Sequence, residues 1–426
     1  MRLPLLMIFV LFIFAVLIDI YILKDLHRVI AQKNRIRWQI GYLISMLIGY
    51  GLLIAVMCMP VRAESSNILP VMWLLYSFLT IYIGKTVYVI FSLIGRLFSV
   101  VGNRFQKEER FERRYGREKK KRYIGCKIGF ILGIASFFLL WWGVFFTRRE
   151  IVVNRVDISS TKLPASFNGF KIVQFSDAHV GTWGNDTTFI SKLVDRINDL
   201  KPDLIVFTGD IVNRRTEELR PFLKVLSRLK AKDGVYSVLG NHDYGDYIDW
   251  SNEADHKKNN ELLARWEKEM GWKLLNNERA FVKRGNDSIV ILGVENWGEP
   301  PFPEYGRLKD AYPLSADSLY NLNDSRFKVL LTHNPEHWSR EVIKISNIDL
   351  SLSGHTHAMQ MMISLGDWKW SPSVFKYSRW GGLYQEKNAS GEPMNLYVNI
   401  GSGEVGMPSR IGSAYPEITE IILHRK

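Results

Sequence analysis

Four long apolar segments lie within the first 150 residues, and they constrain the fold more than any other feature of the chain. They cover about residues 3–23, 40–60, 70–90 and 125–147, each near the ~20 residues that a helix needs to cross a bilayer. Buried helices of a soluble core would also be apolar, but these segments are apolar on all sides and alternate with charged loops. The sequence therefore predicts a transmembrane region with four helices over residues 1–150.

The basic residues of this region predict its orientation. The loops at 24–37 and 104–122 carry five and ten Lys or Arg residues, whereas the loop at 61–69 carries only Arg62. Because basic loops stay in the cytoplasm, we expect everything after the fourth helix to lie outside. Glu alternates with Arg and Lys in 104–122, which predicts a solvated helix attracted to anionic lipid.

The charge is divided unevenly between the two parts of the chain. Residues 1–150 carry 22 Lys or Arg and 8 Asp or Glu, whereas residues 151–426 carry 34 and 35. A nucleic-acid-binding protein needs its positive charge on a folded domain rather than beside apolar segments. We therefore expect the lipid bilayer as a partner, and no nucleic acid.

Two ionisable residues, Asp19 and Lys85, fall within the apolar segments. Charges within a membrane often mark a proton or substrate path. Both residues, however, are expected within a turn or two of the cytoplasmic end, where long side chains reach the interface. We favour this second interpretation.

From residue 169 onward, short apolar runs each end in a cluster of polar residues. Such runs predict buried strands, and the segments 188–200 and 217–229 have the helical spacing that suits crossovers between them. Open α/β folds place their ligand sites at the carboxyl ends of strands. The runs are KIVQF at 171–175 before Asp177 and His179, LIVF at 204–207 before Asp210, VYSVL at 235–239 before Asn241, His242 and Asp243, KVLL at 328–331 before His333, and IDLSLS at 348–353 before His355 and His357.

The polar residues at these strand ends are suited to binding metal ions. Asp177 and His179 are two positions apart, so both can point at one ion, and His355 and His357 repeat this spacing. Oxygen and nitrogen ligands without sulfur suit Mn, Fe, Zn or Ni. Seven ligands match two divalent ions that share a carboxylate and lie ~3.5–4 Å apart, a spacing at which they can bridge a hydroxide and hold phosphoryl oxygens. The predicted ligands are Asp177, His179, Asp210, Asn241, His333, His355 and His357.

The ordered motifs D-x-H, G-D, G-N-H-D, H and G-H-x-H resemble those of the calcineurin-like metallophosphoesterase superfamily, and the resemblance covers nearly all of 169–426. It implies an α/β sandwich over 151–426, with two mixed β-sheets flanked by helices. It also implies that Asp210 bridges the two ions. The first ion would be bound by Asp177, His179, Asp210 and His357, and the second by Asp210, Asn241, His333 and His355.

The same resemblance suggests which residues act on the substrate. His242 is similar to the family's non-ligand histidine, which approaches the phosphate and stabilises the transition state or protonates the leaving oxygen. Asp243 would orient His242. One position departs from the family, because Gly-Gly-Gln commonly follows the last motif and this chain has Ala358-Met359-Gln360. That departure puts the backbone freedom of the site rim in question.

The segment 397–419 is similar to a bacterial, membrane-associated branch of the superfamily, which includes enzymes that hydrolyse UDP-diacylglucosamine. In that branch a Gly-rich turn and an Arg close the active-site side, so Arg410 is a candidate phosphate contact. Alternatively, Arg410 pairs with Glu404 or Glu417. The branch implies a multi-pass protein of the bacterial inner or cytoplasmic membrane, whereas the extracytoplasmic position of the catalytic domain follows from the basic loops.

The segment 366–384 is rich in aromatic residues and contains few charges. These residues could rest on the bilayer interface, line a groove for an acyl or aryl group, or cover the core of the domain itself. The sequence leaves these alternatives open. The aromatic residues are Trp368, Trp370, Phe375, Tyr377, Trp380 and Tyr384.

These features predict a membrane-anchored phosphoesterase that depends on two divalent metal ions. It would hydrolyse a phosphodiester, phosphomonoester or pyrophosphate with a metal-bridging hydroxide. The expected substrate is lipid-linked or part of the cell envelope, such as a lipid pyrophosphate, because a membrane anchor raises the effective concentration of such molecules. The alternative is a non-catalytic scaffold or sensor that keeps the fold, but such a protein would be free to lose ligands and none is missing.

Overall fold

The computed structural model describes residues 5–30, 32–59, 69–104, 111–298, 303–312 and 325–426. The described residues group into two compact units. A helical unit ends at Val144, and a mixed α/β unit begins at Phe145.

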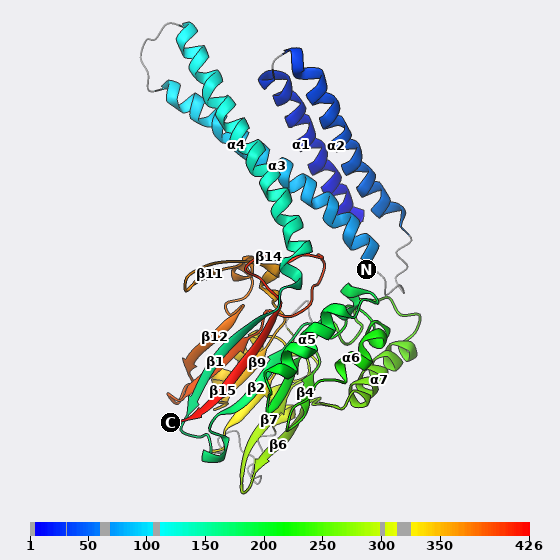
Figure 1. Cartoon of the computed structure of the whole chain (residues 1–426), viewed down its shortest axis with the longest axis vertical. Helices are drawn as coiled ribbons and strands as arrows, with labels where there is room; N and C mark the ends of the chain where they lie inside the picture. The colour runs from blue at the N-terminus through cyan, green and yellow to red at the C-terminus, as the bar shows by residue number, and fades with distance from the viewer. Residues whose placement is uncertain (1–4, 31, 60–68, 105–110, 299–302, 313–324) are drawn as a thin grey trace. The chain divides into compact units, whose positions relative to one another are not determined.

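The helical unit contains the four helices that the sequence predicts (Figure 1). Each helix includes a stretch that is long and apolar enough to cross a membrane, which confirms the prediction of a four-helix transmembrane region. Part of the helix predicted over 104–122 belongs to the start of the fourth helix, and residues 105–110 lie outside the described residues. The helices are α1 (Leu5–Val29), α2 (Gln32–Cys58), α3 (Leu69–Arg104) and α4 (Phe111–Phe145).

Glycines bring α3 and α4 close together. A Cβ atom added to Gly84 on α3 would lie 2.8 Å from the carbonyl oxygen of Gly133 on α4, and one added to Gly133 would lie 2.5 Å from the carbonyl oxygen of Gly84. A Cβ on Gly125 would lie 2.9 Å from the Cα of Gly95. Small residues allow helix backbones to approach in this way, which is how helices pack where no water drives them together.

Asp19 and Lys85 are buried between helices rather than extended toward an interface. The Lys85 Nζ lies 2.9 Å from Asp19 Oδ1, and the hydroxyls of Tyr50 and Tyr82 each donate to Asp19 Oδ2 at 2.8 Å. The hydroxyl of Tyr42 donates to Asp19 Oδ1. The interface interpretation of these two charges is therefore wrong, because they satisfy each other inside the bundle and join α1 to α2 and α3.

A second carboxylate of α1 is satisfied in the same manner. Asp25 is fully buried and accepts hydrogen bonds at 2.8 Å from the hydroxyls of Tyr88 and Ser92 and from the guanidinium of Arg96, all on α3. The thiol of Cys126 on α4 lies 3.2 Å from the same carboxylate. Together, Asp19 and Asp25 connect α1 to the other three helices by polar contacts.

Replacing Asp19 with alanine is expected to destabilise the helical unit by about 3–5 kcal/mol, because it leaves the Lys85 ammonium buried without its counter-ion. The double variant Asp19→Leu/Lys85→Met should recover most of that loss, since it removes both charges together. Thermal unfolding of the full chain in detergent measures the effect. If Asp19→Ala unfolded at the same temperature as the wild type, the stabilising role of the Asp19–Lys85 pair would be contradicted.

The α/β unit is built on two six-stranded mixed sheets and one small sheet. Each of the five apolar runs named above forms a strand of the two six-stranded sheets, as predicted. The first sheet contains, in spatial order, β1 (Val152–Ser160), β15 (Glu417–Arg425), β2 (Phe170–Phe175), β3 (Leu204–Thr208), β4 (Val235–Val238) and β5 (Trp272–Leu274). The second contains β12 (Gly382–Lys387), β13 (Pro393–Val398), β9 (Leu350–Ser353), β8 (Lys328–Leu331), β7 (Asp287–Gly293) and β6 (Glu278–Arg284), and the small sheet contains β11 (Trp368–Trp370), β10 (Met361–Leu365) and β14 (Ile411–Gly412).

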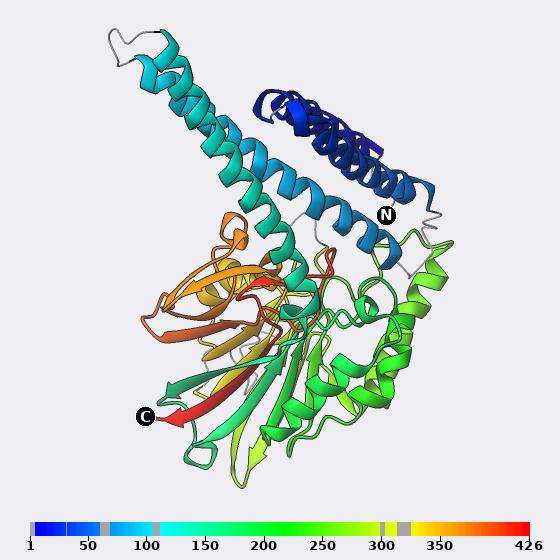
Figure 2. The same cartoon turned by 45° about the horizontal axis from the view of Figure 1, so that its top comes forward.

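The side chains of the central strands alternate between two apolar layers. Ile172 of β2 packs in the core between the two sheets with Val329 of β8, whereas its neighbour Val173 packs under the helices. The helices α5 (Thr188–Asp199), α6 (Leu223–Leu226) and α7 (Glu253–Glu269) cover the outer face of the first sheet (Figures 1 and 2). Trp338 and Leu308 cover the outer face of the second sheet. The fold is therefore the predicted α/β sandwich.

Candidate metal centre

The predicted ligands follow strands whose carboxyl ends point the same way. In the first sheet β2, β3 and β4 are parallel neighbours, and in the second sheet β8 and β9 are parallel neighbours. The loops after these strands therefore meet at one edge of the sandwich. Six of the predicted ligands lie there in groups of three whose donor atoms could hold a metal ion.

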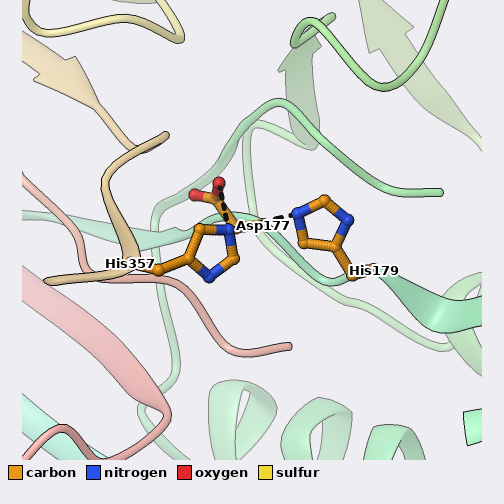
Figure 3. Close-up of side chains that lie close together, drawn as sticks. All are labelled: Asp177, His179 and His357. Atoms are coloured by element: carbon orange, nitrogen blue, oxygen red, sulfur yellow. Dashed lines mark hydrogen bonds and ion pairs between the residues drawn. The ribbon is translucent and has the colours of Figure 1, made fainter. Parts of the chain in front are cut away.

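The first group joins Asp177, His179 and His357 (Figure 3). The Nε2 atoms of His179 and His357 lie 3.1 Å apart, and His357 Nε2 lies 3.1 Å from Asp177 Oδ1. All three side chains are buried. Three donor atoms that converge in this way are arranged to surround a single ion.

The second group joins Asp210, His333 and His355. His333 Nε2 lies 3.1 Å from Asp210 Oδ2 and 3.2 Å from His355 Nδ1. The same Asp210 oxygen lies 3.6 Å from His179 Nε2 of the first group. Asp210 Oδ2 thus faces both groups, which is the position that a bridging ligand would need.

Asn241 presents a buried oxygen at the site. Its Nδ2 donates to the Tyr247 hydroxyl at 2.7 Å, so the nitrogen of the amide faces Tyr247 and the oxygen faces away from it. Its Oδ1 is buried and has no hydrogen-bond partner among the residues that the structure describes. An unsatisfied buried oxygen is costly, so the amide fits a metal ion that would accept its lone pair.

The imidazoles are oriented by hydrogen bonds on their far sides. The Nδ1 atoms of His179 and His333 donate to the backbone carbonyls of Val212 and Thr208 at 3.1 and 2.8 Å. His355 reverses the arrangement, since its Nδ1 faces the group and its Nε2 lies 3.0 Å from the Tyr377 hydroxyl. Such outer contacts set the tautomer of a metal-binding histidine.

Electrostatics favour a cation at this site. Burial lowers the pKa of His179 well below 6.5 and that of His355 to about 3, so both rings are neutral and offer a lone pair at pH 7. Burial also opposes a charge on His333, but the nearby Asp210 carboxylate raises its pKa to about 9. The carboxylates therefore attract positive charge, which a metal ion would supply in place of that proton.

The backbone is strained where it presents these ligands. Asp177, His179, Asp210, His355 and His357 all have positive φ angles, between 39° and 73°. Non-glycine residues rarely adopt this conformation, and such outliers gather at functional sites. All five strained residues lie at one edge of the fold, which indicates that the structure keeps these side chains directed at the site at some energetic cost.

His242 is held at the side of the two groups. Its Nδ1 donates to the Asn213 carbonyl at 2.7 Å, its ring stacks on Tyr247, and its ring centroid lies 4.9 Å from that of His179. Asp243 does not orient it: the carboxylate accepts from backbone amides, including those of Asp210 at 2.7 Å and Ile211 at 2.8 Å. The prediction for Asp243 is corrected, because this buried carboxylate shapes the Asp210 loop instead.

Arg410 is fully buried and turned into the protein. Its nitrogens donate to backbone carbonyls, including those of Ile400 at 3.1 Å, Gly401 at 3.0 Å and Ala414 at 3.2 Å. Burial lowers the pKa of this guanidinium to about 10. These contacts give Arg410 the role of bracing the 400–414 loop, and a direct contact with phosphate stays a prediction that the arrangement does not favour.

Two tyrosines of the site, Tyr247 and Tyr377, were not predicted from the sequence. Tyr247 follows the G-N-H-D motif at 240–243, and Tyr377 lies in the aromatic-rich segment 366–384. Tyr247 contacts Asn241 and His242 within one loop, whereas Tyr377 reaches His355 from a separate segment. The aromatic content of 366–384 was the available signal, and it did not identify which ring would turn inward.

Replacing Tyr377 with phenylalanine is expected to weaken metal binding about 10- to 100-fold, because it removes the hydroxyl that orients His355. Tyr384→Phe is the matched control, since its hydroxyl accepts from the backbone nitrogen of Trp380 and contacts no predicted ligand in the described part of the chain. Titration of each metal-free variant with Mn²⁺ in a calorimeter measures its affinity for the metal. Equal affinities for the two variants would contradict the role of Tyr377.

The fold and the site together define a class: an α/β sandwich with a candidate dinuclear metal centre, attached to a transmembrane helical unit. Comparison with known proteins then identifies the family. Residues 170–359 match the calcineurin-like phosphoesterase model, and residues 1–148 match the model of a probable calcineurin-like phosphoesterase transmembrane domain. The chain belongs to the calcineurin-like phosphoesterase family, and it is a membrane protein.

Relatives from several organisms support this assignment. The metallophosphoesterase YkuE of Bacillus subtilis is 30% identical over 273 residues, which cover 62% of this chain and 83% of YkuE. A transmembrane protein with metallophosphoesterase domain from Danio rerio is 31% identical over 275 residues, covering 63% of this chain but only 56% of that protein. The UDP-2,3-diacylglucosamine pyrophosphatase LpxG of Chlamydia muridarum is 25% identical over 325 residues, covering 66% of this chain and 92% of LpxG.

Proposed function

We propose that this protein is a membrane-anchored phosphoesterase that uses two divalent metal ions to hydrolyse a lipid-linked or envelope phosphate ester or pyrophosphate. The observation that carries the proposal is the position of Asp210 Oδ2, within 3.6 Å of His179 Nε2 and 3.1 Å of His333 Nε2. One carboxylate oxygen between two groups of imidazoles suits a pair of ions. A scaffold that had lost its chemistry would have no need for this arrangement.

The residues of the chain have separate tasks in this proposal. Asp177, His179 and His357 would hold one ion, and Asn241, His333 and His355 the other, with Asp210 shared between them. When bound, the ions would activate water and neutralise the charge on the phosphoryl oxygens. His242 is only partly buried, so its free Nε2 can approach a bound phosphate, stabilise the transition state or protonate the leaving oxygen.

The membrane anchor supports a substrate of the bilayer. An anchored enzyme meets lipids at a high effective concentration, whereas a soluble metabolite would gain nothing from the anchor. The relative LpxG is named as a pyrophosphatase of a UDP-linked diacylglucosamine, which is a lipid with a pyrophosphate bond. The reaction proposed here and the one named for LpxG would both be hydrolysis of a phosphate ester or anhydride close to acyl chains.

The direct test is hydrolysis by the full chain in detergent after removal and return of metal. We expect that a chelator abolishes activity and that Mn²⁺, Zn²⁺, Ni²⁺ or Fe²⁺ restores it. The substrates should include a bis-aryl phosphate, a phosphomonoester and a lipid pyrophosphate, so that release of phosphate or phenol ranks the bond types. Failure to hydrolyse any of them with any of these metals would contradict the proposed function.

The orientation of the domain decides which lipids it meets. The basic loops of the helical unit support an extracytoplasmic domain, which would not encounter a UDP-linked precursor made in the cytoplasm. Protease treatment of cells with a permeable outer layer tests this. Digestion of the domain in intact cells is expected, and full protection would place the domain in the cytoplasm and make UDP-linked lipids available as substrates.

A further inference from the structure

The β10–β11 hairpin of the small sheet has one apolar face. Ile363 pairs with Trp370 and Leu365 pairs with Trp368, and residues paired across antiparallel strands share a face. Leu365 is 70% exposed and Trp368 is 54% exposed. The hairpin therefore presents four large apolar side chains together on a single surface.

The other face of the hairpin is occupied differently. Met362, Ser364 and Lys369 line a groove of about 560 Å³ together with residues of β1 and β12. The side of the hairpin that faces the protein is thus mixed in polarity, while its outward side is apolar. This is the reverse of what an isolated surface hairpin would need for solubility.

The short helix that follows extends the apolar face. In η7 (Pro372–Phe375), Phe375 is 83% exposed, and its ring centroid lies 6.5 Å from that of Trp370. The exposed Lys376 directly follows Phe375 in the chain. Aromatic and apolar side chains next to lysines are typical of protein surfaces that rest at the water–lipid boundary.

The hairpin also belongs to the part of the α/β unit where the chain enters the membrane. The fourth candidate span ends at Arg149, and the turn η1 (Thr147–Arg149) lies against β14. β14 pairs with β10 through Met361 and Ile411. Figure 1 shows β11 and β14 at the same end of the sandwich.

This entry point is fixed within the α/β unit. Arg148 is buried, its Nη2 lies 2.8 Å from the Glu404 carboxylate, and its guanidinium stacks over the Trp183 ring. Glu404 in turn accepts the Thr182 hydroxyl at its backbone carbonyl, at 2.7 Å. The end of the span and the small sheet are therefore parts of one packed structure.

We propose that the apolar face of β10–β11 and η7, made of Ile363, Leu365, Trp368, Trp370 and Phe375, docks into the lipid interface of the bilayer that holds the four helices. The partner is a lipid surface with anionic headgroups, which complement the exposed Lys376 beside Phe375. Docking would hold the metal centre at the surface, because Phe375 is two residues from Tyr377, whose hydroxyl contacts His355. A lipid headgroup could then reach the site without leaving the membrane, a consequence that rests on the proposed function.

Fluorescence in vesicles tests the docking without any assay of activity. The full chain, as Phe375→Cys in a Cys58→Ser background that leaves the buried Cys126 in place, is labelled with an environment-sensitive dye and placed in vesicles of phosphatidylethanolamine and phosphatidylglycerol. The control is Ile345→Cys, an exposed apolar position that precedes β9 and so lies toward the sheet edge opposite the metal centre. We expect lipid-attached quenchers to act at least about twofold more strongly at 375 than at 345, and aqueous iodide to show the opposite order.

Two results would overturn the docking. Equal access of iodide to positions 375 and 345 would show that the hairpin stands in water. Protection from iodide without quenching from the lipid would show that protein covers it, as a second copy of the chain would do.

A separate activity assay tests whether docking gives lipid substrates access to the site. The triple variant Leu365→Ser/Trp368→Ser/Phe375→Ser is expected to keep its rate on a water-soluble bis-aryl phosphate and to lose about tenfold on a lipid pyrophosphate presented in vesicles. Ile345→Ser is the matched control and should lose neither. Equal loss on both substrates would overturn the role in substrate access. Absence of hydrolysis in the wild type would count against the proposed function alone, since the fluorescence result stands independently.

Discussion

Asp210→Asn is expected to lower phosphoesterase activity by at least about a thousandfold and to reduce the bound metal below that of the wild type. The side chain keeps its shape, but an amide carries no charge and cannot bridge two cations with one oxygen. The effect should exceed that of any other single ligand, because Asp210 Oδ2 is the atom that approaches both groups of imidazoles. Metal content by mass spectrometry and hydrolysis of a bis-aryl phosphate measure the two losses together.

The matched control is Asp195→Asn on α5. This carboxylate is exposed and pairs with Arg228 at the surface. It should keep full metal content and rate, since exposed ion pairs contribute little to stability. If Asp210→Asn kept both ions and its rate, Asp210 would not be the bridge. A circular dichroism spectrum like that of the wild type would show that the variant is folded and that any loss comes from the site.

The positions of the metal ligands could be predicted because the signal for them is local. An apolar run buries a strand, and the first polar residues after it must lie at the strand's end. That argument placed Asp177, Asp210 and His333 without knowledge of how the sheets pack. The parallel direction of neighbouring strands then brings their ends together, so the sequence order of the motifs was sufficient to predict one site.

Contacts across layers could not be predicted in this way. Asp243 follows His242 directly, yet the two side chains diverge, and the carbonyl of Asn213 holds the imidazole. Tyr377 reaches His355 from a separate insert. Both contacts depend on the direction in which a loop turns after its strand, and the amino-acid composition of a loop does not predict that direction.

The helical unit shows the same limit. Apolar length predicts that a helix spans the membrane, but not which of its faces meets a neighbour. Asp19 and Lys85 are 66 residues apart and pair only because α1 and α3 present matching faces. The glycines Gly84 and Gly133, which allow α3 and α4 to approach, become informative only when the crossing of the two helices is known.

The departure from Gly-Gly-Gln at the site rim has a physical resolution. Ala358 and Met359 adopt φ angles of 50° and 46°, in the left-handed region that glycine tolerates best. The chain therefore accepts strain where the family commonly has glycine. Hydrogen bonds from the Gln360 amide to the carbonyls of Met407 and Ser409, at 2.9 and 2.8 Å, help to hold this conformation.

His242→Ala is expected to lower the rate about 10²- to 10⁴-fold while both metal ions stay bound, because His242 approaches the substrate and is not one of the predicted ligands. This separates it from Asp210→Asn, which should lose metal. The backbone nitrogen of His242 donates to Asp210 Oδ1 at 2.8 Å, and alanine keeps that contact. His424→Ala, at an exposed position in β15, is the control and should match the wild type.

The choice of leaving group shows what His242 contributes. If its imidazole protonates the leaving oxygen, the variant should lose far more activity on an alkyl phosphodiester than on a nitrophenyl one, since nitrophenolate departs without a proton. Equal losses on both would instead indicate that His242 stabilises charge on the phosphoryl oxygens. Loss of metal in His242→Ala would contradict both roles, because it would make His242 a ligand of the group that it shares with His179 and Asp210.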